Sequence, residues 1–223
     1  MKVTVHGSIV SPWVRRLVAF IEEKEIDYEV ISVVPLGEPD PEFLKISPLG
    51  KIPVLEVSGR HMPDSLAACT FLEREAAEPA LFPKENWDLG WMHWLCDYLA
   101  TGLFAKVEAP LFVQRFVNPV YLGREPDQAV IDEALAAVPE HFDYLQSQLD
   151  DGRPYFLGEA VSLADLTAAS IFINYFHAGE IVDQNRWPRL SGFVDRMLDR
   201  PSFTNILTKE RELMGTASPL FAS

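Results

Sequence analysis

Two hydrophobic periods divide the chain. In the first third, short runs of apolar residues alternate with polar ones, as in strands, and glycines and prolines separate the runs. Beyond about residue 88, the apolar positions recur instead at steps of three and four, which is the period of an amphipathic helix. The pattern predicts a mixed α/β unit followed by an all-helical unit.

The first unit has the order strand, helix, strand, short helix, hairpin and helix. Strands are predicted at residues 2–6, 28–34, 53–57 and 60–62, and helices at residues 12–25, 42–46 and 65–76. Ser58 and Gly59 form a two-residue turn between the last two strands, which is typical of a β-hairpin. All of these elements fit within about 77 residues, the size of a small domain.

The second unit is predicted to be a helical bundle. A stripe of apolar residues runs from Val130 to Leu149, and Pro139 is expected to kink or break that helix. Ser162 and Asp165 form an approximate capping box before another apolar run. Two further helices are predicted at residues 187–198 and 202–214.

The boundary between the two units falls in a segment with two prolines and no clear period. We therefore expect one domain at residues 1–78, a linker at residues 79–87 and a second domain at residues 88–223.

The net charge of the chain limits the kinds of partner that it can be expected to bind. Asp and Glu number 33 against 19 Lys and Arg, which gives a net charge of −14. Long-range repulsion from phosphate backbones and anionic lipids therefore disfavours nucleic acid and membranes as partners. The first residues, MKVTVHGSIVSPW, have only short apolar stretches interrupted by polar residues, so no signal peptide is predicted. No run of roughly 18 apolar residues occurs, so no membrane span is predicted.

The number and spacing of the cysteines indicate the cellular compartment. Cys69 and Cys96 are too few for a disulfide framework and do not have the spacing of zinc ligands, which predicts a reducing cytoplasm. His93 and Asp97 lie four residues apart on a predicted helix, but two ligands do not make a metal site. No metal is therefore expected.

Ser11 stands at the predicted N-terminus of the first helix, directly after the loop that leaves the first strand. Unpaired N–H groups and the positive helix end stabilise an anion at such a point, so a thiol brought there would ionise more easily. The Ser11 hydroxyl would donate a hydrogen bond to the thiolate. An ordinary helix cap also prefers serine, and the local sequence does not separate the two interpretations.

A second candidate segment is SPLGKIPVLE, residues 47–56. Pro53 opens a strand after a glycine-containing turn, where a cis peptide bond would turn the N–H and C=O of Ile52 outward. A peptide ligand would then add there as a short strand. A turn with an ordinary trans proline explains the same residues.

Asp64 and Ser65 begin the next predicted helix. A helix N-terminus attracts a carboxylate and Asp64 can pair with an ammonium group, so together they suit an amino-acid head group. Helix capping accounts for either residue taken alone. The order of all three segments within one strand and helix pattern is what favours a common ligand site.

These segments resemble those of the cytosolic glutathione transferases, in a serine-type, bacterial-like form, and the resemblance extends over essentially the whole chain. SPWVRR is similar to the family's activating-serine segment, SPLGKIPVLE to its NPxGKVPxL segment with the cis-proline, and PDSLAACTFLE to its ESxAIxxYL helix. PALFP and LGEAVSLADLTAAS also resemble their family counterparts. The resemblance implies an α/β thioredoxin-like N-terminal domain followed by an all-α helical-bundle C-terminal domain.

The resemblance also implies roles for individual residues. Ser11 would hold and help ionise the sulfur of glutathione. Ile52 would pair its backbone with the cysteine of the tripeptide, and Pro53 would keep that geometry. Members that use tyrosine place it where this chain has His6, and members resembling glutaredoxins carry cysteine in place of Ser11, so neither chemistry is expected here.

The remaining glutathione contacts are implied at three positions. Lys51 would face the glycine carboxylate, while Asp64 and Ser65 would bind the γ-glutamyl end. Asp64 is one methylene shorter than the family's usual glutamate, which would loosen this contact.

For the second substrate, the resemblance implies a pocket between the loop of the first domain and a helix of the second. Val10, Trp13 and Tyr98 are the candidate lining residues, and Arg115 is the candidate contact for an anionic substrate.

The implied activity is that of a glutathione transferase, in which the thiolate attacks an electrophilic carbon of a largely apolar small molecule and forms a thioether. The resemblance also implies a role in detoxification, glutathione as co-substrate and a homodimer. Two alternatives stay open. One is a glutathione-binding scaffold or regulatory protein without turnover, because a fold does not dictate function. The other is a glutathione-dependent isomerase, peroxidase or dehalogenase.

Overall fold

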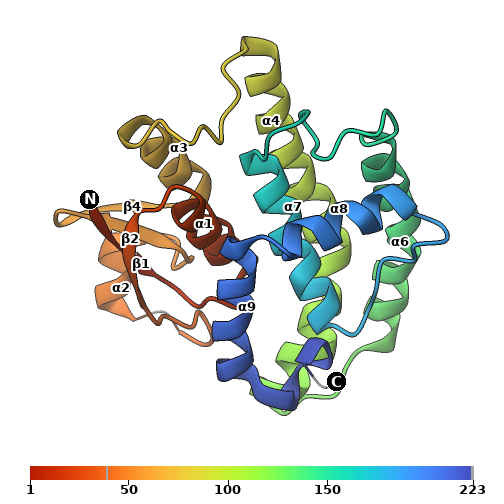
Figure 1. The fold of residues 1–223 in the computed structure, drawn as a ribbon. Coiled ribbons are helices and arrows are strands. Elements are labelled where there is room, and N and C mark those ends of the chain that lie inside the picture. The colour runs from red at the N-terminus through yellow and green to blue at the C-terminus, as the bar shows by residue number, and fades with distance from the viewer. Residues whose placement is uncertain (39, 222–223) are drawn as a thin grey trace.

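A four-stranded mixed sheet organises the N-terminal part of the molecule. The computed structural model describes residues 1–38 and 40–221 (Figure 1). The strands are β1 (Lys2–His6), β2 (Asp27–Ile31), β3 (Val54–Val57) and β4 (Arg60–Pro63). They lie in the order β2-β1-β3-β4, with β1 parallel to β2 and antiparallel to β3. The α/β class predicted for this unit is confirmed.

The hairpin forms as predicted, whereas the second strand is shorter. Ser58 and Gly59, between β3 and β4, both have positive φ angles, 51° and 73°, as a tight two-residue turn requires. β2 ends at Ile31 rather than at Val34. The reason is the end of its partner: β1 stops at His6, and the Gly7 N–H makes the last hydrogen bond, 2.9 Å from the Ile31 carbonyl oxygen.

Three helices complete this unit: α1 (Pro12–Glu23), α2 (Pro41–Ile46) and α3 (Ser65–Glu75). Val3 and Val5 of β1 are buried in the core that α1 and α3 cover. Side chains alternate across a strand, so Thr4 and His6 point to the opposite face. The sheet thus has one apolar face and one polar face.

The C-terminal part is all-helical, as predicted. Its α-helices are α4 (Asn86–Tyr98), α5 (Ala109–Phe112), α6 (Gln128–Ser147), α7 (Leu163–His177), α8 (Pro188–Leu198) and α9 (Pro201–Met214). Two π-helical stretches, Leu99–Glu108 and Val113–Leu122, extend α4 and α5 into one long helical segment. Two short 3-10 turns follow α9, at Gly215–Ala217 and Pro219–Phe221. No helix of the described residues is long and apolar enough to span a bilayer.

α6 continues through Pro139, so the helix does not break at this residue. Val138 and Phe142, on either side of the proline, are buried in the bundle. Their packing holds the helix together across the missing N–H.

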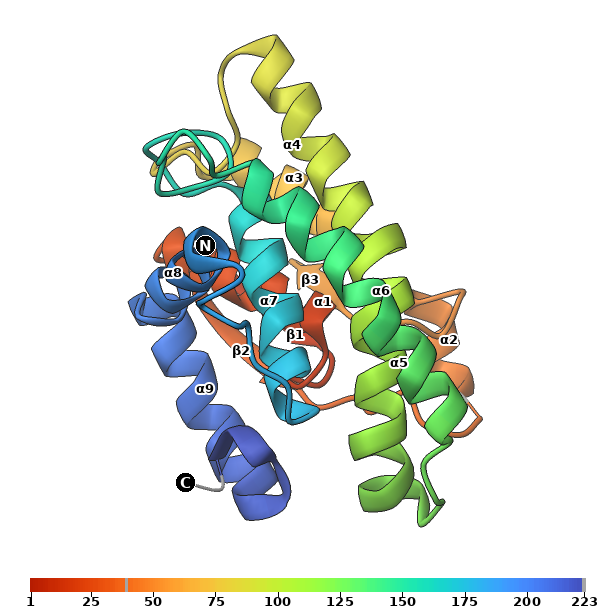
Figure 2. The ribbon, with the colours of Figure 1, turned by 90° about the vertical axis from the view of Figure 1, so that its right-hand side faces the viewer.

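α7 lies at the centre of the molecule (Figure 2). Every residue of α7 except Phe176 is buried, and the helix begins with the predicted capping box of Ser162 and Asp165. Arg15 of α1 is also fully buried, and its guanidinium donates hydrogen bonds to Glu210 of α9 and to Asn174 of α7. These contacts fix α1, and with it the loop before α1, against the helical bundle.

Candidate functional site

A cleft of about 690 Å³ lies where α1, the residues before β3 and the start of α3 face α4. The five residues predicted to bind glutathione all line it: Lys51, Ile52, Pro53, Asp64 and Ser65. Trp13 and Phe104 form an apolar wall, with their ring centroids 4.8 Å apart in an edge-to-face arrangement. The cleft therefore joins a polar side from the N-terminal unit to an apolar side shared by both units.

Hydrogen bonds within one turn hold the Lys51–Pro53 side of the cleft. The buried Ser47 hydroxyl donates to the Lys51 carbonyl oxygen at 2.7 Å, and the Gly50 N–H donates to the Ser47 carbonyl oxygen at 2.8 Å. The Ile52–Pro53 peptide bond is cis. Within residues 1–38 and 40–221, neither backbone group of Ile52 forms a backbone hydrogen bond. An extended ligand can therefore pair with Ile52 without displacing a protein contact.

The start of α3 forms the second polar side. Asp64 Oδ1 accepts hydrogen bonds from the Leu66 and Ala67 N–H groups at 2.8 and 2.9 Å, so one carboxylate oxygen caps the helix. Asp64 has a φ of 84°, an unfavourable conformation for a residue with a Cβ. Its N–H donates to the Pro53 carbonyl oxygen at 3.3 Å. This bond links the two polar sides of the cleft directly.

Arg16 is a functional candidate that the sequence analysis missed. The side chain lines the cleft and is only 4% exposed, and its Nη2 donates a hydrogen bond to Ser65 Oγ. Its guanidinium carbon lies 4.9 Å from the centre of the Trp13 ring. Nε has no hydrogen-bond partner, and no carboxylate in the described part of the chain pairs with Arg16. A buried cation without an acidic partner leaves the cleft wall suited to an anion.

One sequence signal pointed toward this residue. Arg15 and Arg16 are consecutive between Val14 and Leu17, two of the apolar positions of this helix, which places both arginines near its inward face. In the structure both are buried, Arg15 between the two units and Arg16 at the cleft. The two arginines differ in pairing, because Arg15 Nη2 lies 2.6 Å from Glu210 Oε1.

Ser11 lies at the N-terminus of α1 and is half-buried. Its side chain makes no capping hydrogen bond, so the hydroxyl is not used by the helix. Ser11 is not among the residues that line the cleft, whereas Trp13, two positions later, is. The structure therefore places the predicted thiol-activating residue beside the cleft rather than in its wall.

Two of the candidate electrophile contacts lie outside this cleft and belong to packing. Val10 is buried in a small cluster with Phe116 and Met214. The Tyr98 hydroxyl forms a hydrogen bond with His141 Nδ1 at 2.9 Å, and burial raises the pKa of Tyr98 to about 12. Both side chains are thus engaged with the protein itself.

Arg115 also lies away from the cleft. It forms an ion pair with Glu180, and it donates a hydrogen bond to the Ala178 carbonyl oxygen at 3.1 Å. Of the four candidates for the electrophile pocket, the cleft contains Trp13 alone.

α4 contributes His93, Cys96 and Asp97 to the opposite wall. Cys96 is 3% exposed, and burial raises the pKa of its thiol, so it stays protonated at neutral pH. Burial has the same effect on the Cys69 thiol. Neither cysteine is therefore a candidate nucleophile.

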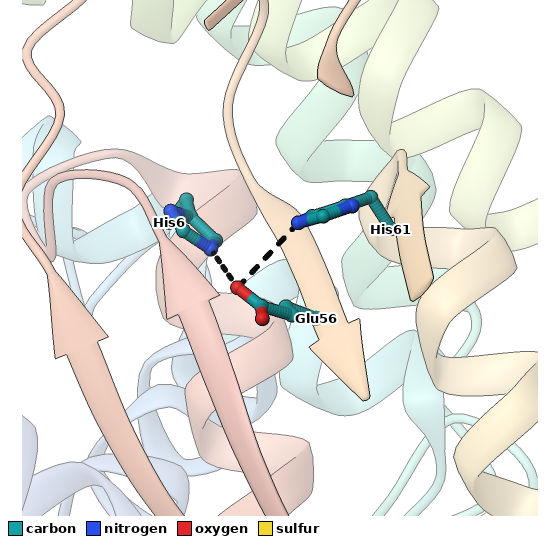
Figure 3. A group of neighbouring side chains, drawn as sticks. All are labelled: His6, Glu56 and His61. Carbon is teal, nitrogen blue, oxygen red and sulfur yellow. Dashed lines mark hydrogen bonds and ion pairs between the residues drawn. The ribbon is translucent and has the colours of Figure 1, made fainter. Parts of the chain in front are cut away.

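Among the described residues, three side chains have ligand atoms close enough together to hold one metal ion: His6, Glu56 and His61 (Figure 3). Glu56 Oε2 lies 2.8 Å from His6 Nε2 and 3.5 Å from His61 Nε2. The hydrogen bond from His6 lowers the pKa of Glu56. The group belongs to the polar face of the sheet and does not line the cleft.

Comparison with known proteins identifies the family. Residues 10–75 match the model of the glutathione S-transferase N-terminal domain, and residues 103–201 match that of the C-terminal domain. Glutathione S-transferase 4 of Zea mays is 30% identical over 179 residues, which cover 76% of this chain and 75% of that protein. Elongation factor 1-gamma 2 of Oryza sativa subsp. japonica is 27% identical over 169 residues, which cover 75% of this chain and 38% of that protein.

A solved structure agrees with the sequence matches. A glutathione S-transferase from Rhodospirillum rubrum F11 has a TM-score of 0.85 and 26% identity, covering 92% of both chains. Together with the paired domain matches, this likeness means that the chain belongs to the cytosolic glutathione S-transferase superfamily.

Proposed function

We propose that this protein binds glutathione in the cleft and conjugates its thiolate to an electrophilic, largely apolar small molecule. The observation that carries the proposal is the convergence of Lys51, Ile52, Pro53, Asp64 and Ser65 on one cleft that also has an apolar wall. Polar groups placed at the side of an otherwise apolar pocket are typical of small-molecule sites.

The polar side suits the two ends of the tripeptide. The free backbone groups of Ile52 would pair with its cysteine, and the ammonium group of Lys51 would meet the glycine carboxylate. Only Oδ1 of Asp64 caps α3, so Oδ2 would pair with the γ-glutamyl ammonium. Ser65, which accepts a hydrogen bond from Arg16, would bind the γ-glutamyl carboxylate.

Ser11 would act on the sulfur. Its hydroxyl is free of the helix cap, and the N-terminus of α1 supplies a positive potential. In the reaction, the thiol loses its proton to solvent, and the Ser11 hydroxyl donates a hydrogen bond to the resulting thiolate. The sulfur electron pair then forms the bond to the electrophilic carbon, whose leaving group departs with its bonding pair. The Trp13 and Phe104 rings would hold the apolar electrophile.

Conjugation of a chlorodinitrobenzene tests the proposal, with Ser11→Ala as the variant and Ser8→Ala as the matched control in the same loop. We expect Ser11→Ala to lower kcat/KM about 100-fold, as when a donor to a developing anion is removed. It should also raise the apparent pKa of bound glutathione by about one to two units. Ser8→Ala should leave both unchanged. A wild-type rate equal to the uncatalysed rate across a panel of electrophiles would contradict the proposal.

The likeness to an elongation factor supports a second candidate function. That relative contains a segment similar to this chain, but the protein as a whole is named for a different activity. A glutathione-binding scaffold or regulatory protein would bind the tripeptide without turnover over the electrophile panel, and pull-down experiments would recover a stable partner. An isomerase, peroxidase or dehalogenase would instead turn over its own substrates with the same thiolate.

The proposal includes a homodimer, a cytoplasmic location, a role in detoxification, and domains at residues 1–78 and 88–223 joined by the linker. Light scattering on the purified chain tests the oligomeric state. Limited proteolysis tests the boundary, because cleavage should concentrate at residues 79–87.

A further inference from the structure

Three strands bring His6, Glu56 and His61 to one face of the sheet (Figure 3). Glu56 of β3 lies directly opposite His61 of β4, and Thr4 of β1 lies opposite Glu56 on the other side. His6 is two residues beyond Thr4 and therefore points to the same face as Glu56. The backbone register of the sheet thus holds the three side chains together.

The positions of the ligand atoms fit a small metal ion. The nearest nitrogen or oxygen atoms of the three side chains lie within 4.8 Å of one another. Around a tetrahedral zinc ion with bonds of about 2.1 Å, ligand atoms stand about 3.4 Å apart. Glu56 Oε2 lies 2.8 Å and 3.5 Å from the two histidine nitrogens, close to this spacing. Small side-chain rotations would complete the fit.

We propose that His6, Glu56 and His61 form a binding site for a divalent transition-metal ion, with zinc(II) as its preferred occupant. Two imidazoles and one carboxylate are a set that binds zinc in proteins and leaves a fourth position for water. Magnesium and calcium prefer oxygen ligands, and this site offers one carboxylate. Two neutral imidazoles with a carboxylate carry one negative charge, which attracts a dication.

The site is open enough for an ion to enter. The side chains of Glu56 and His61 are each 31% exposed, and that of His6 is 13% exposed. The cysteines do not compete for the ion, because both are buried. Cys69 belongs to α3, which covers the apolar face of the sheet, and Cys96 belongs to α4 of the helical bundle. Binding would tie β1, β3 and β4 together in the native state only, and would therefore stabilise the fold.

Isothermal titration calorimetry of the full chain with zinc chloride tests the site. Glutathione is left out of the buffer, because its thiol binds zinc. We expect one zinc ion per chain with micromolar affinity, and in a thermal melt we expect zinc to raise the melting temperature by several degrees. Glu56→Gln and His61→Ala should each weaken binding about tenfold or more, the loss seen when groups that support a metal are removed. Cobalt(II) at the same site should give the visible absorption of a four-coordinate ion.

The control is His93→Ala, which removes the histidine that lies four residues before Asp97 on α4. It should leave zinc affinity unchanged. Loss of binding in His93→Ala, undiminished binding in His61→Ala, or the absence of a stoichiometric zinc complex would each overturn the proposal. So would equal affinity for magnesium, because that would indicate a nonspecific acidic surface.

Discussion

The guanidinium of Arg16 donates a hydrogen bond to the hydroxyl of Ser65, and both side chains are buried at the wall of the cleft. The bond connects α1 to the first residue of α3. Arg16 keeps an unpartnered Nε, and within the described residues it has no acidic partner. Desolvated guanidinium groups normally pair with carboxylates or phosphates, so this arrangement favours a ligand that supplies the missing carboxylate.

Replacing Arg16 with glutamine should therefore weaken glutathione binding. Gln keeps a donor for Ser65 but removes the positive charge. We expect KM for glutathione to rise about tenfold, a change of about 1.4 kcal/mol, with a smaller change in kcat. Steady-state kinetics with varied glutathione measures both.

A truncated ligand separates a role in binding the γ-glutamyl end from general damage to the cleft. Cysteinylglycine lacks the γ-glutamyl group, so its use as a thiol substrate should be nearly insensitive to Arg16→Gln. If Arg16→Gln lowered activity equally with both thiols, Arg16 would support the fold of the cleft and would not bind the γ-glutamyl carboxylate.

Gly7 should be intolerant of any side chain. A Cβ at this position would lie 2.5 Å from Cγ2 of Val14 and 3.4 Å from Cβ of Ile52. Gly7→Ala should therefore lower the free energy of unfolding by about 1–3 kcal/mol, as overpacking does, and disturb the cleft through Ile52. Urea denaturation measures the first effect and glutathione affinity the second.

Gly90 of α4 provides the matched control, because a Cβ there would meet nothing within 4 Å. Gly90→Ala should raise the free energy of unfolding by about 0.5–1 kcal/mol, since alanine favours a helix over glycine. A similar loss of stability in both variants would show that the contact with Val14 is not the cause.

Local chemistry made most of the fold predictable. Turns, caps and apolar periods act over a few residues, which is why β1, the hairpin and the start of α7 were predicted closely. The second strand was predicted to extend to Val34, but it ends at Ile31. Whether residues 33 and 34 continue the strand depends on where β1 ends, and the local sequence at these residues does not determine that.

Long-range partners explain what the sequence analysis of side chains missed. The roles of Arg115 and Tyr98 depend on Glu180 and His141, which lie 65 and 43 residues away along the chain. His6 meets Glu56 only through strand register, 50 residues apart. Helix caps and turns identified candidate positions around the cleft, but only the fold reveals which charges find partners.

Asp165, which caps α7, should be highly sensitive to substitution. It is fully buried and accepts hydrogen bonds from the Phe156 N–H, the Ser162 N–H and the Ser162 hydroxyl at 2.9, 2.7 and 2.6 Å. The Phe156 N–H binds Oδ1, and both Ser162 donors bind Oδ2. Asp165→Asn replaces one of these oxygens with an amide NH2, which would face a donor instead of an acceptor, and should cost about 2–4 kcal/mol.

The exposed cap Asp127 of α6 is the control for this substitution. Its Oδ1 accepts one hydrogen bond, from the Ala129 N–H at 2.9 Å. Asp127→Asn should cost less than about 1 kcal/mol, because asparagine is also a good helix cap. If chemical denaturation gave equal losses for the two variants, burial of the acceptor would not explain the sensitivity of Asp165.

Glu108 should make the protein less stable as the pH rises. Its side chain is fully buried, and burial raises its pKa from 4.5 to about 8, although the nearby side chains of Asn174 and Arg15 oppose part of this rise. Between these two pH values, the unfolded chain is ionised at this residue while the folded chain keeps the proton. The unfolded state binds fewer protons, so the contribution of Glu108 to stability falls across pH 4.5–8 and is lost above it.

Glu108→Gln removes this titration while keeping the size and shape of the neutral acid. We expect the variant to match the wild type at about pH 4 and to exceed it by about 1–3 kcal/mol at pH 8. Subtracting the two profiles is necessary, because the pKa of buried His177 is lowered by burial and changes stability in the opposite direction at low pH. Glu133→Gln, at an exposed position of the neighbouring helix α6, should leave the slope unchanged. If the free energy of unfolding changed with pH in the same way in the wild type and in Glu108→Gln, Glu108 would ionise as easily in the folded protein as in the unfolded chain.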